Sequence, residues 1–194
     1  MNFERDNFYH LYNRSNRGLP VFYNDDSYDY FLKKVNKNWL PYLDIIAYCL
    51  MPTQFHFMIK VKEKTEDNKL NNTIGKLLSS YTRALNNQLN LNGSLFQNHT
   101  KSKNLFKESR LNDLELISVG YPLACFNYIH QNPIKDNIVT DIIDWQYSSY
   151  LEYAGLREAT ICNLELGEEM FEFKRGNKFI ELTKSITKGN FKFE

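Results

Sequence analysis

The sequence predicts an α+β domain in which helices cover an antiparallel sheet. Predicted strands, which show alternating or continuously apolar residues, and predicted helices, which show a helical period of apolar residues, follow one another in the order β-α-β-β-α-β-α. Two of the expected strands are joined by a connection short enough to favour an antiparallel hairpin. The chain has 194 residues, of which 42% are hydrophobic and 24% charged, which suits one domain with a generous core.

The first 62 residues contain three expected strands and one expected helix. Residues 7–14, NFYHLYNR, predict a strand, and a turn-rich segment follows it. Asn24 or Asp25 is expected to cap a helix whose apolar residues keep helical spacing and which ends before Pro41. The apolar run at 44–50 and the alternating run at 54–62 predict the hairpin.

A long amphipathic helix is expected at 68–90, because leucines and other apolar residues form one stripe along it. Asn92 and Gly93 break the helical pattern. A short basic segment follows and is predicted to be strand-like around residues 95–97. This strand would complete the sheet.

Two helical pieces are expected to flank Gly120. The second begins with Pro122, a favoured first-turn residue, and is expected to end at Pro133. The motif DWQYSSYLEYAG then predicts a turn into a short helix that Ser148 caps and that ends at Gly155.

The stretch MPTQFHFMIK raises the first question about chemistry. Gln54 and His56 are two residues apart on a strand, so their side chains share one face and could reach the same ion. An imidazole nitrogen and an amide oxygen are both possible ligands of a divalent cation. The alternative is a structural histidine that is held by a hydrogen bond.

A second candidate is the helix in CFNYIHQNP. Tyr128 and Asn132 are four residues apart and share a face, whereas His130 points elsewhere. A phenol with a polar amide one turn away could be a nucleophile beside a metal ligand. The alternative is a packed tyrosine whose hydroxyl lies at the surface.

The net charge of +1 hides an uneven distribution. Between Lys76 and Arg110 six basic residues stand against one acid, and the segment also carries Tyr81, Phe96 and Phe106. Basic and aromatic side chains together suit a single nucleic-acid strand, which they bind by neutralising phosphates and stacking on bases. The alternative is a solvated charged face.

The sequence gives simple indications of compartment. No apolar run approaches the length of a membrane span, and the N-terminus lacks an apolar stretch of signal-peptide type. The three cysteines, Cys49, Cys125 and Cys162, are far apart and form neither a disulfide framework nor a metal-binding pair. We therefore expect a cytoplasmic, nucleoid-associated protein with no membrane contact.

Taken together, the motifs resemble the IS200-like tyrosine transposases of the HUH endonuclease class, and most closely their REP-associated branch. The similarity runs from Phe8 to Gly155 and rests on YHLYNRSNRGLPVF, AYCLMPTQFHFMIK, GSLFQ, YIHQNPIKDNIV and DWQYSSYLEYAG. It implies a ferredoxin-like domain at residues 1–155, followed by a C-terminal extension at 156–194. The implied activity is cleavage and rejoining of hairpin-containing single-stranded DNA.

The resemblance also implies roles for individual residues. Tyr128 would be the nucleophile that forms a 5′-phosphotyrosine link, and Mg²⁺ or Mn²⁺ would be held by His56, Asn132 and Gln54. The family has histidine at the position of Gln54, so weakened activity is one expectation. Residues expected to contact DNA are Arg14, Arg17, Lys76, Arg83, Lys101 and Lys103.

Two other functions remain open at this stage. One is a domesticated protein that binds hairpin DNA without cutting it, for which Gln54 is the supporting feature. The other is an unrelated ferredoxin-like RNA-binding module with aromatic residues exposed on its sheet. The sequence also leaves open whether the protein is a monomer or a homodimer.

Overall fold

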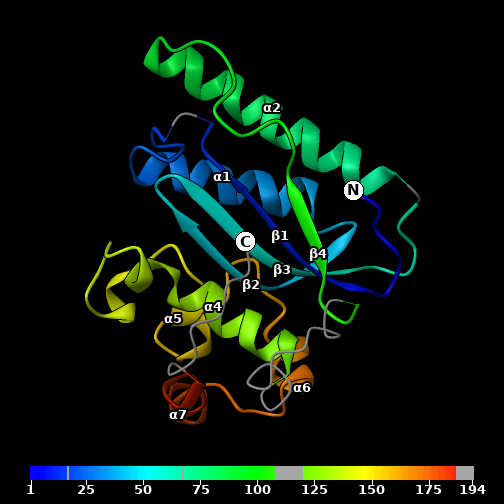
Figure 1. The fold of residues 1–194 in the computed structure, drawn as a ribbon, viewed down its shortest axis with the longest axis vertical. Helices are drawn as coiled ribbons and strands as arrows, with labels where there is room; N and C mark the ends of the chain where they lie inside the picture. The colour runs from blue at the N-terminus through cyan, green and yellow to red at the C-terminus, as the bar shows by residue number, and fades with distance from the viewer. Residues whose placement is uncertain (17, 67, 108–119, 187–194) are drawn as a thin grey trace.

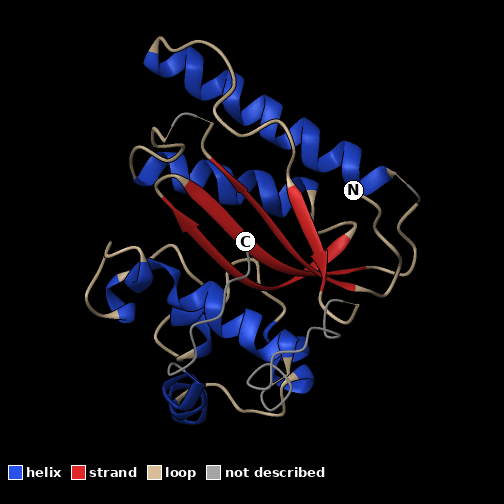
Figure 2. Ribbon diagram, viewed as in Figure 1, coloured by secondary structure: helices blue, strands red, loops and turns tan. Residues whose placement is uncertain are grey.

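The structure is a computed structural model that describes residues 1–16, 18–66, 68–107 and 120–186. A four-stranded sheet lies between two layers of helices (Figures 1 and 2). The elements are β1 Phe8–Arg14, α1 Asp25–Asn38, β2 Leu43–Met51, β3 Gln54–Val61, α2 Lys69–Leu89, β4 Lys101–Asn104, α4 Tyr121–Lys135, the 3₁₀ turn η2 Ile142–Asp144, α5 Tyr150–Tyr153, α6 Leu164–Met170 and α7 Asn177–Ile186.

The strands follow the spatial order β2-β3-β1-β4, and every neighbouring pair is antiparallel. The first six elements run β-α-β-β-α-β, and with this strand order they form a ferredoxin-like unit. Helices α4 to α7 are added after it. The predicted α+β class, with an antiparallel sheet covered by helices, is confirmed.

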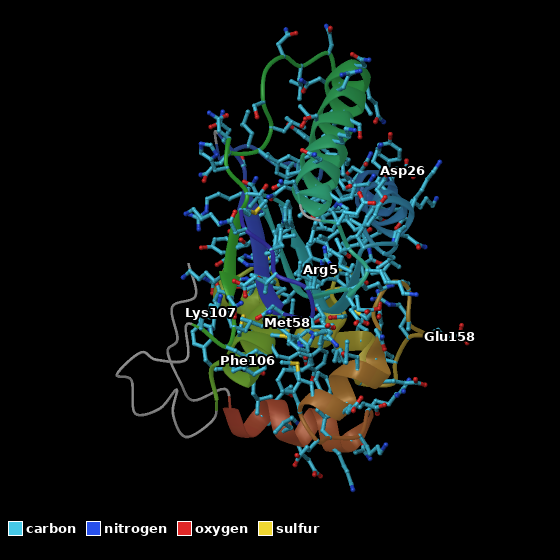
Figure 3. All side chains as sticks on the ribbon, turned by 90° about the vertical axis from the view of Figure 1, so that its right-hand side faces the viewer. Arg5, Asp26, Met58, Phe106, Lys107 and Glu158 are labelled. Atoms are coloured by element: carbon cyan, nitrogen blue, oxygen red, sulfur yellow. The ribbon has the colours of Figure 1, made fainter. Side chains whose placement is uncertain are left out.

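The alternation of β3 separates two cores. Phe55, Phe57 and Ile59 belong to the core that lies under α1 and α2. Met58, labelled in Figure 3, belongs to the other core, which α4 covers. Because side chains alternate along a strand, His56 shares the face of Met58. The polar face of β3 is therefore buried under a helix.

Helices α1 and α2 form one layer. Asn24 caps α1, as one of the two predicted residues, and completes a reciprocal capping box with Ser27. Helix α2 ends at Leu89, and Asn90 takes the left-handed conformation that commonly follows a helix. The apolar stripe of α2 is buried against α1 and the sheet.

Helix α4 lies across the other face of the sheet and contacts β2 and β3. Its predicted end at Pro133 is wrong, because the helix continues to Lys135. A proline inside a helix removes one backbone hydrogen bond, and its ring crowds the carbonyl one turn earlier. Because Pro133 lies so close to the C-terminus, the last turn still closes. The backbone N–H of Asp136 donates to the carbonyl of Asn132 at 2.9 Å.

The W-x-x-SS motif joins β2 to the helices that follow it. The indole of Trp145 donates to the carbonyl of Leu50 at 3.0 Å, and the Ser149 hydroxyl accepts the Tyr48 backbone N–H at 2.9 Å. Helix α5 is shorter than predicted, Tyr150–Tyr153, and the Ser148 hydroxyl accepts the N–H of its first residue. The motif therefore fixes the edge of the sheet.

Described residues beyond 155 pack on the core that α4 covers. The N–H of Asn163 donates to the carbonyl of Ile45 on β2, and that of Gly176 donates to Tyr153, both at 2.8 Å. Phe179 of α7 is fully buried. The division into residues 1–155 and a C-terminal extension stays a prediction. No helix in the described ranges has the length and apolar character needed to cross a membrane.

One predicted strand is not formed, and one predicted helix falls outside the described residues. The strand expected around 95–97 is wrong: the fourth strand is β4, and Phe96 makes only an isolated bridge to Ser15. Phe96 is instead buried among core rings. The helix expected before Gly120 falls on residues 108–119, outside the described ranges.

Candidate active site

The register of β1 with β3 builds a polar row under α4. Arg14 lies opposite Gln54, Tyr12 opposite His56, and His10 opposite Met58. Directly opposite residues of antiparallel strands project from the same face. The polar side chains of both central strands therefore meet on one side of the sheet.

His10 and His56 are linked to each other. His10 Nε2 lies 3.0 Å from His56 Nδ1, and both rings are fully buried. Burial lowers the pKa of His56 to about 3, helped by the nearby Arg14 guanidinium. Burial, His56 and Lys103 together hold the pKa of His10 well below its usual value. Both imidazoles are neutral at physiological pH, which is the state in which an imidazole binds metal.

Tyr128 of α4 packs edge-on against this pair. Its ring centre lies 5.7 Å from that of His56 and 6.0 Å from that of His10. Only 9% of the residue is exposed. Burial raises the pKa of the phenol, Cys125 and Asp136 add to the rise, and Arg14 opposes it. The predicted nucleophile and the predicted imidazole ligand are thus neighbours.

The two predicted amide ligands border the same place. Asn132 lies one helical turn after Tyr128; its side chain is buried, and its Nδ2 has no hydrogen-bond partner within the described residues. Gln54 begins β3, and its Nε2 donates to Asp136 Oδ2 at 3.0 Å. Asp136, the C-cap residue of α4, follows Asn132 by four residues, so Tyr128, Asn132 and Asp136 follow one another along one side of the helix and its C-terminal end.

Basic side chains surround the row. Arg14 flanks Gln54 on β1, and β4 places Lys103 opposite His10 and Lys101 opposite Tyr12. The Lys101 ammonium lies 5.7 Å from the centre of the Tyr12 ring. On α4, the Lys135 ammonium lies 4.8 Å from the centre of the Tyr128 ring, and burial lowers its pKa. Cations therefore approach the phenol from the strands and from its own helix.

Two of the predicted DNA-contacting residues, Lys76 and Arg83, are not brought to this place. Lys76 and Arg83 are exposed on α2, in the helical layer on the opposite side of the sheet from α4. Arg17 lies outside the described residues. Contact of these residues with DNA stays a prediction; Lys76 and Arg83 lie on the other side of the sheet from Tyr128.

His130 has the structural role that its spacing suggests. It points away from the Tyr128 stripe, and its Nε2 lies 2.8 Å from the Ser149 hydroxyl. The ring is fully buried among aromatic residues, including Phe126 and Phe179. Burial lowers its pKa to about 3. It joins α4 to the serine that holds β2.

The sequence-based reasoning missed His10, Tyr12, Lys135 and Asp136. His10 and Tyr12 alternate on β1 as Gln54 and His56 do on β3, so the pattern YHLYN could have predicted a second row of polar side chains on one face of the sheet. Asp136 follows Asn132 by four residues, the spacing that had singled out Asn132 itself. The expected end of the helix at Pro133 hid that relation.

Within the described ranges no group of three or more His, Cys, Asp and Glu side chains is arranged to hold a metal ion. A site built on His56 would therefore depend on amide oxygens. Asn132 fits this need, because its amide is buried with an unused nitrogen, and amide oxygen and nitrogen exchange places by a simple flip. The donor set suits an oxygen-preferring ion.

Comparison with known proteins is informative at the level of structure. No family description and no curated protein sequence matches the chain. Among solved structures, a REP-associated tyrosine transposase bound to a REP hairpin is similar, with a TM-score of 0.58 and 13% sequence identity. The match covers 83% of this chain and 93% of the other. At this identity the similarity shows a shared fold.

Proposed function

We propose that the protein binds hairpin-containing single-stranded DNA and cleaves and rejoins it through Tyr128. The observation that carries the proposal is the packing of the Tyr128 phenol against His56, with ring centres 5.7 Å apart, under a helix that also holds Asn132. The fold shared with a transposase bound to a REP hairpin supports the substrate class. A structural tyrosine would not need an imidazole, an amide and basic side chains at one place.

A divalent ion, Mg²⁺ or Mn²⁺, would be held by His56, Asn132 and Gln54, and would polarise the scissile phosphate. Asp136 adds a carboxylate beside Gln54, and these ions usually bind through at least one carboxylate. Among the described residues the buried amide nitrogen of Asn132 has no hydrogen-bond partner, which supports a flipped amide whose oxygen would face a bound cation.

The chain's own contribution is a positioned nucleophile. The Tyr128 oxygen loses its proton and attacks phosphorus; the bond to the 3′ oxygen breaks, and that oxygen takes up a proton. The products are a 5′-phosphotyrosine and a free 3′-hydroxyl, and the reverse reaction rejoins the strand without ATP. Because burial raises the pKa of Tyr128, positive charge must favour the phenolate, and Arg14 acts in that direction.

Binding of the DNA backbone would rest on Arg14, Lys101 and Lys103, which lie on the same face as His56. Each phosphate that they neutralise releases counterions and adds affinity without sequence preference. Lys76 and Arg83 could contribute only if the hairpin extended around the sheet to the α2 layer. The protein would act as a monomer or a homodimer.

A second function, binding of hairpin DNA without cleavage, is favoured by one observation. The Gln54 amide nitrogen is bound to Asp136, so the residue that replaces the family histidine is occupied by a neighbour. An RNA-binding module with an open sheet is disfavoured, because helices cover both faces of the sheet and Tyr12 is buried.

The test is incubation of the protein with hairpin-containing single-stranded DNA and Mg²⁺ or Mn²⁺, followed by a denaturing gel. A DNA–protein adduct that is absent in Tyr128→Phe supports cleavage. Hairpin binding without an adduct, in a gel-shift assay under the same conditions, supports the second function. Failure to bind single-stranded hairpins at all would contradict both.

A further inference from the structure

The contact between His10 and His56 is a hydrogen bond made along the line between the rings. The ring planes are 19° apart, and the ring centres are separated by 5.2 Å. This separation exceeds the 3.0 Å between the two nitrogens by about two imidazole ring radii, so the nitrogens lie on the line between the centres. The two rings therefore meet edge to edge and share one proton.

This geometry argues against His10 as a second ligand of the same ion. Two imidazoles that bind one ion point their lone pairs at a third point, away from the line between their nitrogens. Here His10 Nε2 and His56 Nδ1 point at each other. With Nδ1 committed to His10, Nε2 is the nitrogen with which His56 would coordinate.

The position of the shared proton decides whether His56 can bind an ion. If His10 donates, His56 carries its own proton on Nε2 and cannot coordinate there. If His56 donates from Nδ1, its Nε2 has a lone pair. Cationic side chains flank both rings, Arg14 beside His56 and Lys103 beside His10, so charge alone favours neither arrangement.

We infer that His10 is the positioning residue of the site: it accepts the Nδ1 proton of His56 and so fixes the tautomer and ring orientation with which His56 holds a cation. This inference rests on the proposed function. Metal-binding histidines usually donate their second N–H to an outer partner, and loss of that partner typically costs about 10- to 100-fold in affinity. His10 is an unusual partner because it is itself an imidazole, fully buried between β3 and β4.

The chain offers a matched set of variants. His10→Phe keeps a flat ring but removes the acceptor, whereas His10→Gln keeps an acceptor oxygen. His130→Phe is the control, because His130 is equally buried and also makes one side-chain hydrogen bond, but on the Ser149 side of α4. Mn²⁺ affinity is measured by calorimetry, and thermal melting is followed in parallel.

We expect His10→Phe to bind Mn²⁺ about 10- to 100-fold more weakly, His10→Gln to stay within a few-fold of wild type, and His130→Phe to lower only the melting temperature. Equal Mn²⁺ affinity in wild type and His10→Phe would overturn the inference. So would equal losses in His10→Phe and His10→Gln, because a purely structural role predicts them.

Side-chain ¹⁵N NMR spectra give a second test of the inference. Because the chain has only four histidines, their resonances can be assigned from single variants. With diamagnetic Zn²⁺ bound, we expect the proton on His56 Nδ1. The ¹⁵N chemical shift of a metal-bound nitrogen is expected for His56 Nε2 and for neither nitrogen of His10. Metal-type shifts on His10 would overturn the inference. A wild-type protein that binds neither ion would refute the proposed metal chemistry. The spectrum of the ion-free protein then tests the inference about the tautomer alone: a proton on His56 Nδ1 would support it, and a proton on His56 Nε2 would overturn it.

Discussion

Acid should destabilise this protein at a pH where most small domains are still near their maximum stability. Three of its four histidines are fully buried and neutral, and burial is the largest cause of the low pKa of each. In the unfolded chain each would titrate near 6.5. Protons therefore bind the unfolded state first, and the free energy of unfolding falls as the pH drops below about 6.5.

The magnitude follows from the two pKa values. His56 and His130 each have a folded pKa of about 3. Linkage between pKa values of about 6.5 and 3 gives a loss on the order of 2 kcal/mol per histidine between pH 8 and pH 5. His10 acts in the same direction. Against a typical total stability of about 5–15 kcal/mol, these losses are large.

The assay is urea unfolding at several pH values between 8 and 5, with His130→Gln as the comparison. The variant should be less stable at pH 8, but its free energy of unfolding should fall by on the order of 2 kcal/mol less between pH 8 and pH 5. Carboxylate titrations are common to both proteins and cancel. The same pH dependence in wild type and variant would show that burial does not hold His130 neutral.

Four further predictions concern the site. Tyr128→Phe should abolish the DNA adduct and leave hairpin affinity within about twofold, because phosphates and bases carry binding; a residual adduct would mean another nucleophile. Gln54→His should raise Mn²⁺ affinity and adduct yield by about tenfold or more, since misplaced ligands are costly; an unchanged, substantial yield would make glutamine a competent ligand. Asp136→Asn should reduce the adduct if the carboxylate binds the ion, whereas a faster reaction would mean that Asp136 only raises the pKa of the phenol. Replacing Lys101 and Lys103 by glutamine should flatten the log–log salt dependence of binding by about 0.7 for each lost phosphate contact, and an unchanged slope would leave them as solvated charges.

The parts of the fold that could be predicted are those with a local signal. The alternation around His56, the cap at Asn24 and the stripe of α2 each depend on neighbours within a few residues, and the structure agrees with all three. The segment KSKN has no apolar alternation, and β4 exists because β1 offers it a free edge. A strand defined by its partner cannot be identified from its own residues.

The same distinction applies to the site. Tyr128 and Asn132 are related by one helical turn, so their common face could be predicted from spacing alone. His10 and His56 are separated by 46 residues, and only the register of β1 with β3 brings them together. Sequence spacing indicated the candidate nucleophile and ligands, whereas the partner that orients the imidazole required the sheet.

The replacement at position 54 has a physical consequence that the Asp136 contact makes specific. In the transposases that the sequence resembles, position 54 is a histidine, which is neutral when it binds an ion, so glutamine leaves the ligand charge unchanged. Under the proposed function Asp136 would contribute the negative charge; it lies beside Gln54 because α4 continues past Pro133 to Lys135 and the Gln54 amide donates to its carboxylate. If the proposed function holds, Gln54 and Asp136 would act as a pair: the amide donates to the carboxylate and would hold it near the ion position, and the carboxylate would supply the attraction for Mg²⁺ that an amide lacks. On this reasoning Gln54→His should raise ion affinity more in the Asp136→Asn background than in wild type, and equal gains in the two backgrounds would show that the two positions act independently.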